Sequence, residues 1–158
     1  SIPPGLRCNT LSVIFLTVFR RLAFCSTCMD WGMPLLAMCY ARGPSIKDSF
    51  NPEAVAHAAR VGAELGADIV KCSYTGDIDS FSRVVEGCPV PVVIAGGPQM
   101  DSDMDILNMV EGSLQAGGHG VSIGRNVFQH RDVQGIMGAI SDICLKGFTA
   151  KEAYDKHF

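Results

Sequence analysis

The chain has 158 residues, of which 47% are hydrophobic and 18% are charged, and its formal net charge is -3. This length and composition predict one soluble domain with its own core and exclude a disordered chain. Without a basic excess, nucleic acid is not expected as a partner. The apolar run from Leu11 to Phe19 is too short to span a bilayer, so no membrane segment is expected either.

Seven cysteines are scattered along the chain, an odd number that does not suit a disulfide framework. Several fall in apolar stretches, which predicts reduced, buried thiols and a cytoplasmic protein. Cys25 and Cys28 form a C-x-x-C pair. Because no second pair of ligands accompanies it, zinc is not expected there.

From Gly32 onward, short apolar runs alternate with helical patterns. Strands are predicted over residues 34–40, 69–73, 90–95 and 120–124, and helices over 52–65, 79–85, 103–114 and 132–145, with a last helix after Thr149. The continuous apolar run at 34–40 predicts a strand buried on both faces. N-caps are expected at Asn51 and, after the lysine strand, among Asp77 and Asp79, and Thr149 with Glu152 spells a capping box.

Repeated strand–helix units indicate a parallel sheet, in either an open doubly wound fold or a (β/α)8 barrel. Neither G-x-G-x-x-G nor a P-loop signature is present, which weakens the nucleotide-binding open sheet. Polar and glycine residues cluster just past the strand ends, where barrels carry their active sites. Four units amount to half a barrel, so we expect strands five to eight of a (β/α)8 TIM barrel.

A lysine stands in the middle of an apolar strand, at Lys71. Lysine is depleted from strands and is almost never fully buried without a reason, which makes Lys71 a candidate reactive amine. The alternative is a lysine on an edge strand whose stem reaches out to water.

Tyr40 closes the preceding predicted strand. Consecutive parallel strands usually pair, so Tyr40 and Lys71 are expected on neighbouring strands about 5 Å apart. A phenol beside a desolvated amine suits Schiff-base chemistry, since burial favours the neutral amine that attacks a carbonyl. The alternative is a core tyrosine whose hydroxyl is a polar handle.

Gly96-Gly97 and Gly124-Arg125 follow the last two predicted strands. Glycines there let backbone N–H groups approach a ligand, and Arg125 adds a charged donor, which together predict a phosphate site. Taken singly, each glycine pair could be merely a turn. The four histidines do not cluster, and none is assigned a catalytic role.

Four motifs together carry a resemblance to a known family. They are MPLLAMCYARG at 33–43, DIVKCSYTGD at 68–77, VIAGGP at 93–98 and GRNVFQ at 124–129. The chain resembles the archaeal-type class I (Schiff-base) aldolase family from about Cys28 onward. That family includes fructose-bisphosphate aldolase, and the resemblance is nearest to its 2-amino-3,7-dideoxy-D-threo-hept-6-ulosonate synthase branch, on a route to dehydroquinate and aromatic amino acids.

The resemblance implies a role for each motif. Lys71 would be the Schiff-base lysine and Tyr40 the proton donor. Arg42 would contact the sugar-phosphate substrate, and its phosphate would be held by Gly96, Gly97, Gly124 and Arg125. It implies no metal or other cofactor, a three-carbon fragment transferred from lysine to aspartate semialdehyde, and a homo-oligomer for the full-length family.

The family has four strands ahead of Tyr40, including a general-base aspartate, and nothing between Ser1 and Thr27 matches them. We therefore expect an unmatched segment at 1–27 and a partial barrel at 28–158, with the sequence a piece of a longer protein. A half barrel has two open sheet edges, so instability or self-association is expected. Three functions stay open: a synthase, a class I fructose-bisphosphate aldolase, and an inactive remnant that binds phosphate.

Overall fold

The computed structural model describes residues 25–43, 46–100 and 102–158. After a helical stretch at 25–30, the elements are β1 (Leu36–Met38), α2 (Pro52–Glu64), β2 (Ile69–Cys72), α3 (Ile78–Glu86), β3 (Val92–Ala95), α4 (Asp103–Gln115), β4 (Val121–Ser122), α5 (Arg125–Phe128), α6 (Val133–Lys146) and α7 (Ala150–His157). The N-terminal segment predicted to be unmatched, residues 1–27, lies outside the described chain up to residue 24, as does the apolar run at 11–19.

The four strands form one parallel sheet in the order β1-β2-β3-β4. The predicted parallel α/β architecture is therefore confirmed. Lys71 pairs with Met38 on one side and with Val93 on the other, so its strand is internal. The alternative of an edge-strand lysine is wrong.

The two faces of the sheet differ in burial. Val70, Cys72, Val92 and Ile94 are fully buried and belong to a core that includes Val55 and Ala59 of α2. On the other face of β1, Leu36 and Met38 are 40% and 58% exposed. The prediction that this strand is buried on both faces is wrong, because β1 is an edge strand of the described sheet and no described element covers that face.

Three of the helices begin where local side-chain chemistry predicts. Asn51 caps α2 and Asp77 caps α3, each accepting a hydrogen bond from the backbone N–H three residues on, at 3.1 and 2.8 Å. Thr149 and Glu152 form the capping box of α7. These caps satisfy N–H groups that no helical carbonyl can reach.

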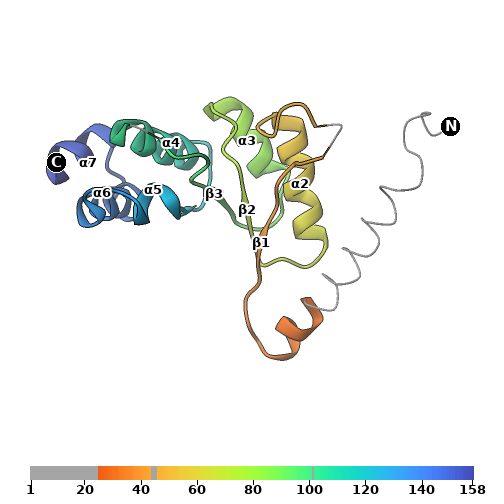
Figure 1. The fold of residues 1–158 in the computed structure, drawn as a ribbon. Coiled ribbons are helices and arrows are strands. Elements are labelled where there is room, and N and C mark those ends of the chain that lie inside the picture. The colour runs from red at the N-terminus through yellow and green to blue at the C-terminus, as the bar shows by residue number, and fades with distance from the viewer. Residues whose placement is uncertain (1–24, 44–45, 101) are drawn as a thin grey trace.

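Figure 1 shows the helices in two groups with the strands between them: α2 and α3 on one side, α4 to α7 on the other. The core follows this division only in part. One cluster joins the sheet to α2 and α3 and also includes Met109 of α4, and the other joins α4, α5, α6 and α7. Val121 and Ile123, at the end of the sheet, pack against both clusters, so β4 connects them.

Other features differ from the sequence-based expectation mainly in length. Every strand is shorter than predicted, and the four-residue helix α5 was not predicted. Among the described residues, no helix is long and apolar enough to cross a membrane. Cys25, Cys72 and Cys88 are buried free thiols, and burial raises the pKa of Cys72 to about 12, so it stays protonated at neutral pH.

Candidate active site

All seven residues predicted for the site line one cavity of about 380 Å³ beyond the carboxyl ends of the strands. The cavity is also lined by Ser49, Phe50, Ser73, Ala95, Pro98, Ser122 and Asn126. Residues from four separate strand ends therefore meet in one place, which only the parallel arrangement of the sheet allows. The geometry agrees with the predicted constellation, and the chemical role of each residue remains a prediction.

Lys71 is part of β2 and reaches the cavity from the middle of the sheet, partly buried. Its flanking residues Val70 and Cys72 point the opposite way, into the core, and are fully buried. This alternation follows from the two-residue period of a strand. Packing of Val70 and Cys72 thus fixes the backbone from which the Lys71 side chain lines the cavity.

Tyr40 does not pair with Lys71 across the sheet. β1 ends at Met38, which is the partner of Lys71, and the N–H of Cys39 donates to the Lys71 carbonyl at 2.8 Å. Tyr40 is the next residue, in the loop that follows the strand. The expected strand-to-strand pairing is therefore wrong in its register, although both side chains line the same cavity.

Tyr40 is held as a neutral phenol. Partial burial raises its pKa above the usual value of 10, and the nearby Cys72 and Cys39 add to the rise, while the Arg42 guanidinium opposes it. The Arg42 guanidinium carbon lies 5.2 Å from the centre of the Tyr40 ring, a cation–π distance. A neutral phenol can donate a proton, and Arg42 is held beside it.

The glycines of the site are there for different reasons. At Gly96 a Cβ atom would meet Cγ2 of Ile123 at 2.7 Å, so close packing requires glycine. Gly97 has φ of +66°, a left-handed conformation that glycine adopts without strain. At Gly124 a Cβ atom would meet no described atom within 4 Å. Neither packing nor a positive φ (its φ is -108°) requires glycine at position 124, and the missing side chain leaves room for a ligand at the cavity surface.

Asn126 also lines the cavity, although no role was predicted for it. Only 4% exposed, it forms hydrogen bonds with the loop that follows β3. Arg125, its neighbour, is exposed and donates from Nη2 to the Gly97 carbonyl at 3.2 Å. The signals for Asn126 in the sequence were its position directly after Gly124-Arg125 and its place in the GRNVFQ motif.

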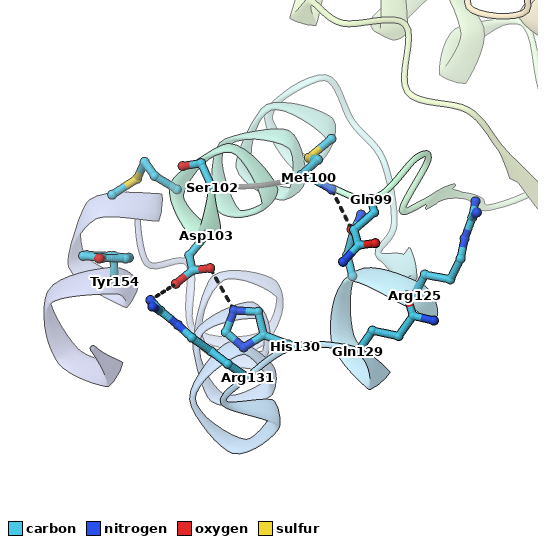
Figure 2. A pocket seen from close by; sticks show the side chains of 11 residues that line it. Gln99, Met100, Ser102, Asp103, Arg125, Gln129, His130, Arg131 and Tyr154 are labelled. Carbon is cyan, nitrogen blue, oxygen red and sulfur yellow. Dashed lines mark hydrogen bonds and ion pairs between the residues drawn. The ribbon is translucent and has the colours of Figure 1, made fainter.

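A second cavity, of about 530 Å³, lies next to the first and shares Arg125 and Asn126 with it. One of its lining residues is Asp103, which accepts from Nε2 of His130 at 2.8 Å and from Arg131 at 3.2 Å (Figure 2). These bonds lower the pKa of Asp103. They tie the start of α4 to the residues before α6, and Figure 2 shows Arg125 on the opposite side of the cavity from this cluster.

The remaining histidines are placed away from the first cavity. His57 and His119 are exposed, and His157 bonds to Asp142 at 2.9 Å. In the described part of the chain, no group of three or more His, Cys, Asp or Glu side chains is placed to hold a metal ion.

A parallel α/β sheet whose strand ends carry a polar cavity with an inward lysine is an arrangement typical of (β/α) enzymes. Residues 20–130 match the DeoC/LacD family of aldolases. The chain belongs to this family.

Individual relatives agree with this membership. The chain is 43% identical over 121 residues to the 2-amino-4,5-dihydroxy-6-oxo-7-(phosphonooxy)heptanoate synthase of Streptomyces griseus, across 77% of this chain and 44% of the synthase. It is 50% identical over 101 residues to a 2-amino-3,7-dideoxy-D-threo-hept-6-ulosonate synthase of Archaeoglobus fulgidus, across 64% of this chain and 36% of that enzyme.

A solved structure of similar fold is an archaeal fructose-1,6-bisphosphate aldolase with its catalytic lysine covalently bound to the carbinolamine intermediate of the substrate. It has a TM-score of 0.80 and 35% identity, and the match covers 82% of this chain and 52% of the aldolase chain. This chain therefore spans about half the length of its relatives or less.

Proposed function

We propose that this chain is the C-terminal half, strands five to eight, of a (β/α)8 barrel aldolase that forms a Schiff base on Lys71. The observation that carries the proposal is the single cavity in which Lys71 and Tyr40 meet Gly97, Gly124 and Arg125. Membership of the aldolase family and the half-length match to a Schiff-base aldolase support it.

In the proposed reaction the neutral Lys71 amine attacks the ketone carbon of a phosphorylated ketose. The carbinolamine that forms loses water, with a proton delivered to its hydroxyl by Tyr40, and leaves a protonated Schiff base. The positive nitrogen accepts the electron pair of the carbon–carbon bond as that bond breaks, and the Tyr40 phenolate left by the dehydration accepts the proton of the substrate hydroxyl that becomes the aldehyde. Cleavage releases an aldehyde and leaves a three-carbon enamine on Lys71.

Arg42 and Arg125 are the charged donors of the cavity. An arginine binds phosphate oxygens through charge-assisted hydrogen bonds, and the glycine-lined loops let backbone N–H groups approach the same anion. We assign the phosphate of the ketose to Gly96, Gly97, Gly124 and Arg125, and a further contact with the sugar phosphate to Arg42. Holding the phosphate at one end of the cavity places the ketone near Lys71 at the other.

The enamine has two proposed fates. In the synthase reading it attacks the aldehyde carbon of aspartate semialdehyde and gives a seven-carbon product. The names of the similar synthases support only the seven-carbon product, and for those enzymes. In the alternative reading the chain acts as a fructose-bisphosphate aldolase, supported by the likeness to the solved aldolase. Both readings use Lys71 and Tyr40 in the same way.

Borohydride trapping tests the proposal. Incubation of the chain with a ketose phosphate and borohydride should add the mass of the reduced adduct to Lys71, because reduction of the Schiff base makes the bond permanent. Lys71→Met should remove the adduct, whereas Lys151→Met, which deletes an exposed lysine of α7, should keep it. An adduct that survives Lys71→Met contradicts the assignment.

The absence of any adduct would instead favour an inactive remnant that only binds phosphate. If the adduct forms, adding aspartate semialdehyde and analysing the products separates the two enzyme readings. A seven-carbon product supports the synthase, and release of the three-carbon fragment alone supports the aldolase.

A further inference from the structure

Asn126 forms three hydrogen bonds with one short loop. Its Nδ2 donates to the Gly96 carbonyl at 2.7 Å and to the Pro98 carbonyl at 3.0 Å, and its Oδ1 accepts from the Met100 N–H at 3.0 Å. All three partners are backbone groups in the segment that follows β3. The side chain is 4% exposed, so water cannot easily replace these bonds.

The pattern fits an asparagine amide and few other side chains. It offers two N–H donors and an acceptor in one plane, and here both donors face carbonyls while the acceptor faces an N–H. Turning the amide around would set its oxygen against two carbonyl oxygens, so the hydrogen-bond pattern fixes its orientation.

These bonds determine how the loop presents its backbone. In a trans peptide the carbonyl and the following N–H point in opposite directions. Binding the Gly96 carbonyl therefore directs the Gly97 N–H away from Asn126, and binding the Pro98 carbonyl does the same for the Gln99 N–H. Arg125 also anchors the loop through its bond to the Gly97 carbonyl, although the next residue, Pro98, has no N–H to direct.

We infer that Asn126 is a positioning residue, which fixes the loop at 96–100 so that the loop and Arg125 together hold the substrate phosphate. The inference rests on the proposed function. Asn126 does not act on the reacting atoms. It sets the distance between the anchored phosphate and Lys71, through a side chain that is itself almost inaccessible.

The test uses borohydride trapping on the full chain with two ketones, dihydroxyacetone phosphate and dihydroxyacetone. Asn126→Asp keeps the shape and the acceptor for the Met100 N–H but loses both donors. Its half-saturating concentration of the phosphorylated ketone should rise about tenfold, the worth of one net hydrogen bond. Trapping of the ketone without phosphate should stay unchanged, which a merely structural role would not produce.

Asn126→Ala should behave in the same direction, and Asn108→Asp, at an exposed position of α4, should behave as wild type. Equal effects on both ketones, or no effect on either, would overturn the inference. If the variants do not fold, as judged by circular dichroism, hydrogen exchange on the wild-type chain decides. Inorganic phosphate should then slow exchange at the amides of Gly97 and Gln99, and unchanged exchange would overturn the inference.

Failure of the proposed function is a separate result. If neither ketone is trapped on the wild-type chain, Lys71 is not the reactive amine under these conditions. Binding of inorganic phosphate to wild type and to Asn126→Asp then still tests the positioning role, with weaker binding by the variant expected and equal binding contrary to it.

Discussion

Tyr40 is the residue at which electrostatics bears most directly on the proposed chemistry. Tyr40→Phe removes the hydroxyl and keeps the ring beside Arg42. Because the phenol is proposed to deliver a proton, we expect turnover to fall about 100- to 10,000-fold. Dehydration of the carbinolamine should slow as well, while the attack of Lys71 remains possible. Steady-state turnover and the rate of borohydride trapping, measured on the same preparation, separate these effects.

The pH dependence of turnover in wild type and in Tyr40→Phe is a further check on the proposed role of Tyr40. Its pKa is raised above 10, and the protonated phenol, the active form, predominates below that pKa. The advantage of wild type over Tyr40→Phe should therefore persist from neutral pH up to pH 10 and shrink only above it. A loss of the advantage near neutral pH would contradict the proposed role.

Gly124 gives a residue-scale prediction that separates binding from folding. Since a Cβ atom there meets no described atom within 4 Å, Gly124→Ala should change the free energy of unfolding by less than about 0.5 kcal/mol. Phosphate binding should nevertheless weaken, because the methyl group takes up space at the cavity surface. Thermal melting and phosphate titration of the variant test both parts.

Gly97→Ala is the matched comparison for this variant. Its φ of +66° places alanine in a left-handed conformation, at a cost of about 1–2 kcal/mol. A stability loss in Gly124→Ala as large as that in Gly97→Ala would show that Gly124 is required by the fold and not by a ligand.

At the scale of the elements, the helix starts were predictable because their causes are local. Asn51, Asp77 and Thr149 each bond to a backbone N–H three residues away, a contact that sequence spacing alone implies. Strand ends have no such local marker. The strand predicted over 34–40 ends at Met38, since hydrogen bonds from β2 and not apolar character determine its length.

The residues of the candidate active site also divide into those whose role has a signal in the sequence and those whose role depends on long-range contacts. Lys71, near the carboxyl end of β2, and Gly97 and Arg125, just past the ends of β3 and β4, could be predicted because parallel strands bring their carboxyl ends to one edge. Asn126 could not, because its three bonds go to residues 26 to 30 positions earlier in the chain. Only the placement of two loops against each other makes that asparagine distinctive.

Asp142 joins the last two helices and gives an element-scale prediction. Buried in α6, it bonds to Lys156 at 2.6 Å and to His157 at 2.9 Å in α7, and to Lys146 at 2.5 Å in its own helix. Hydrogen bonds from these three partners, that from Lys146 the strongest, hold the pKa of Asp142 far below its usual value. Asp142→Asn should lower the melting temperature at neutral pH by loosening α7.

The sign of the pH effect follows from the lowered pKa. Asp142 stabilises the fold fully above its ordinary unfolded-state pKa of about 3.9, and this stabilisation is lost as the pH falls below it. The difference in melting temperature between wild type and Asp142→Asn should therefore shrink as the solution is acidified below about pH 4. Asp155→Asn, at an exposed position of α7, should show neither effect. A difference in melting temperature that grows in acid would contradict the proposed stabilisation of α7 by Asp142.

For the whole molecule, the sheet is the feature with most consequence. The described sheet has β1 at one edge and β4 at the other, and the chain spans about half of the solved aldolase it resembles. A closed eight-stranded barrel has no such edges. The proposed half barrel therefore needs four further parallel strands against β1 and β4, whether these come from the rest of a longer protein or from another chain.

Because one face of β1 is exposed, we expect this chain to self-associate when it is studied alone. Leu36 and Met38 expose apolar surface on an edge strand, and unpaired edges add hydrogen-bonding groups to the same surface. We expect the weight-average mass in sedimentation equilibrium to rise with concentration. Met38→Lys should reduce this rise, because a lysine on an edge strand opposes strand-to-strand pairing.

Met137→Lys is the matched control. It introduces the same charge at a methionine that is 51% exposed on α6, away from the sheet, so it should leave the association unchanged. Equal reductions by both variants would indicate a general effect of charge and not a role of the sheet edge. A monomeric wild-type chain at every concentration would mean that the apolar face of β1 is covered within the chain itself. The proposed half barrel would then have to be abandoned in favour of a sheet that needs no further strands.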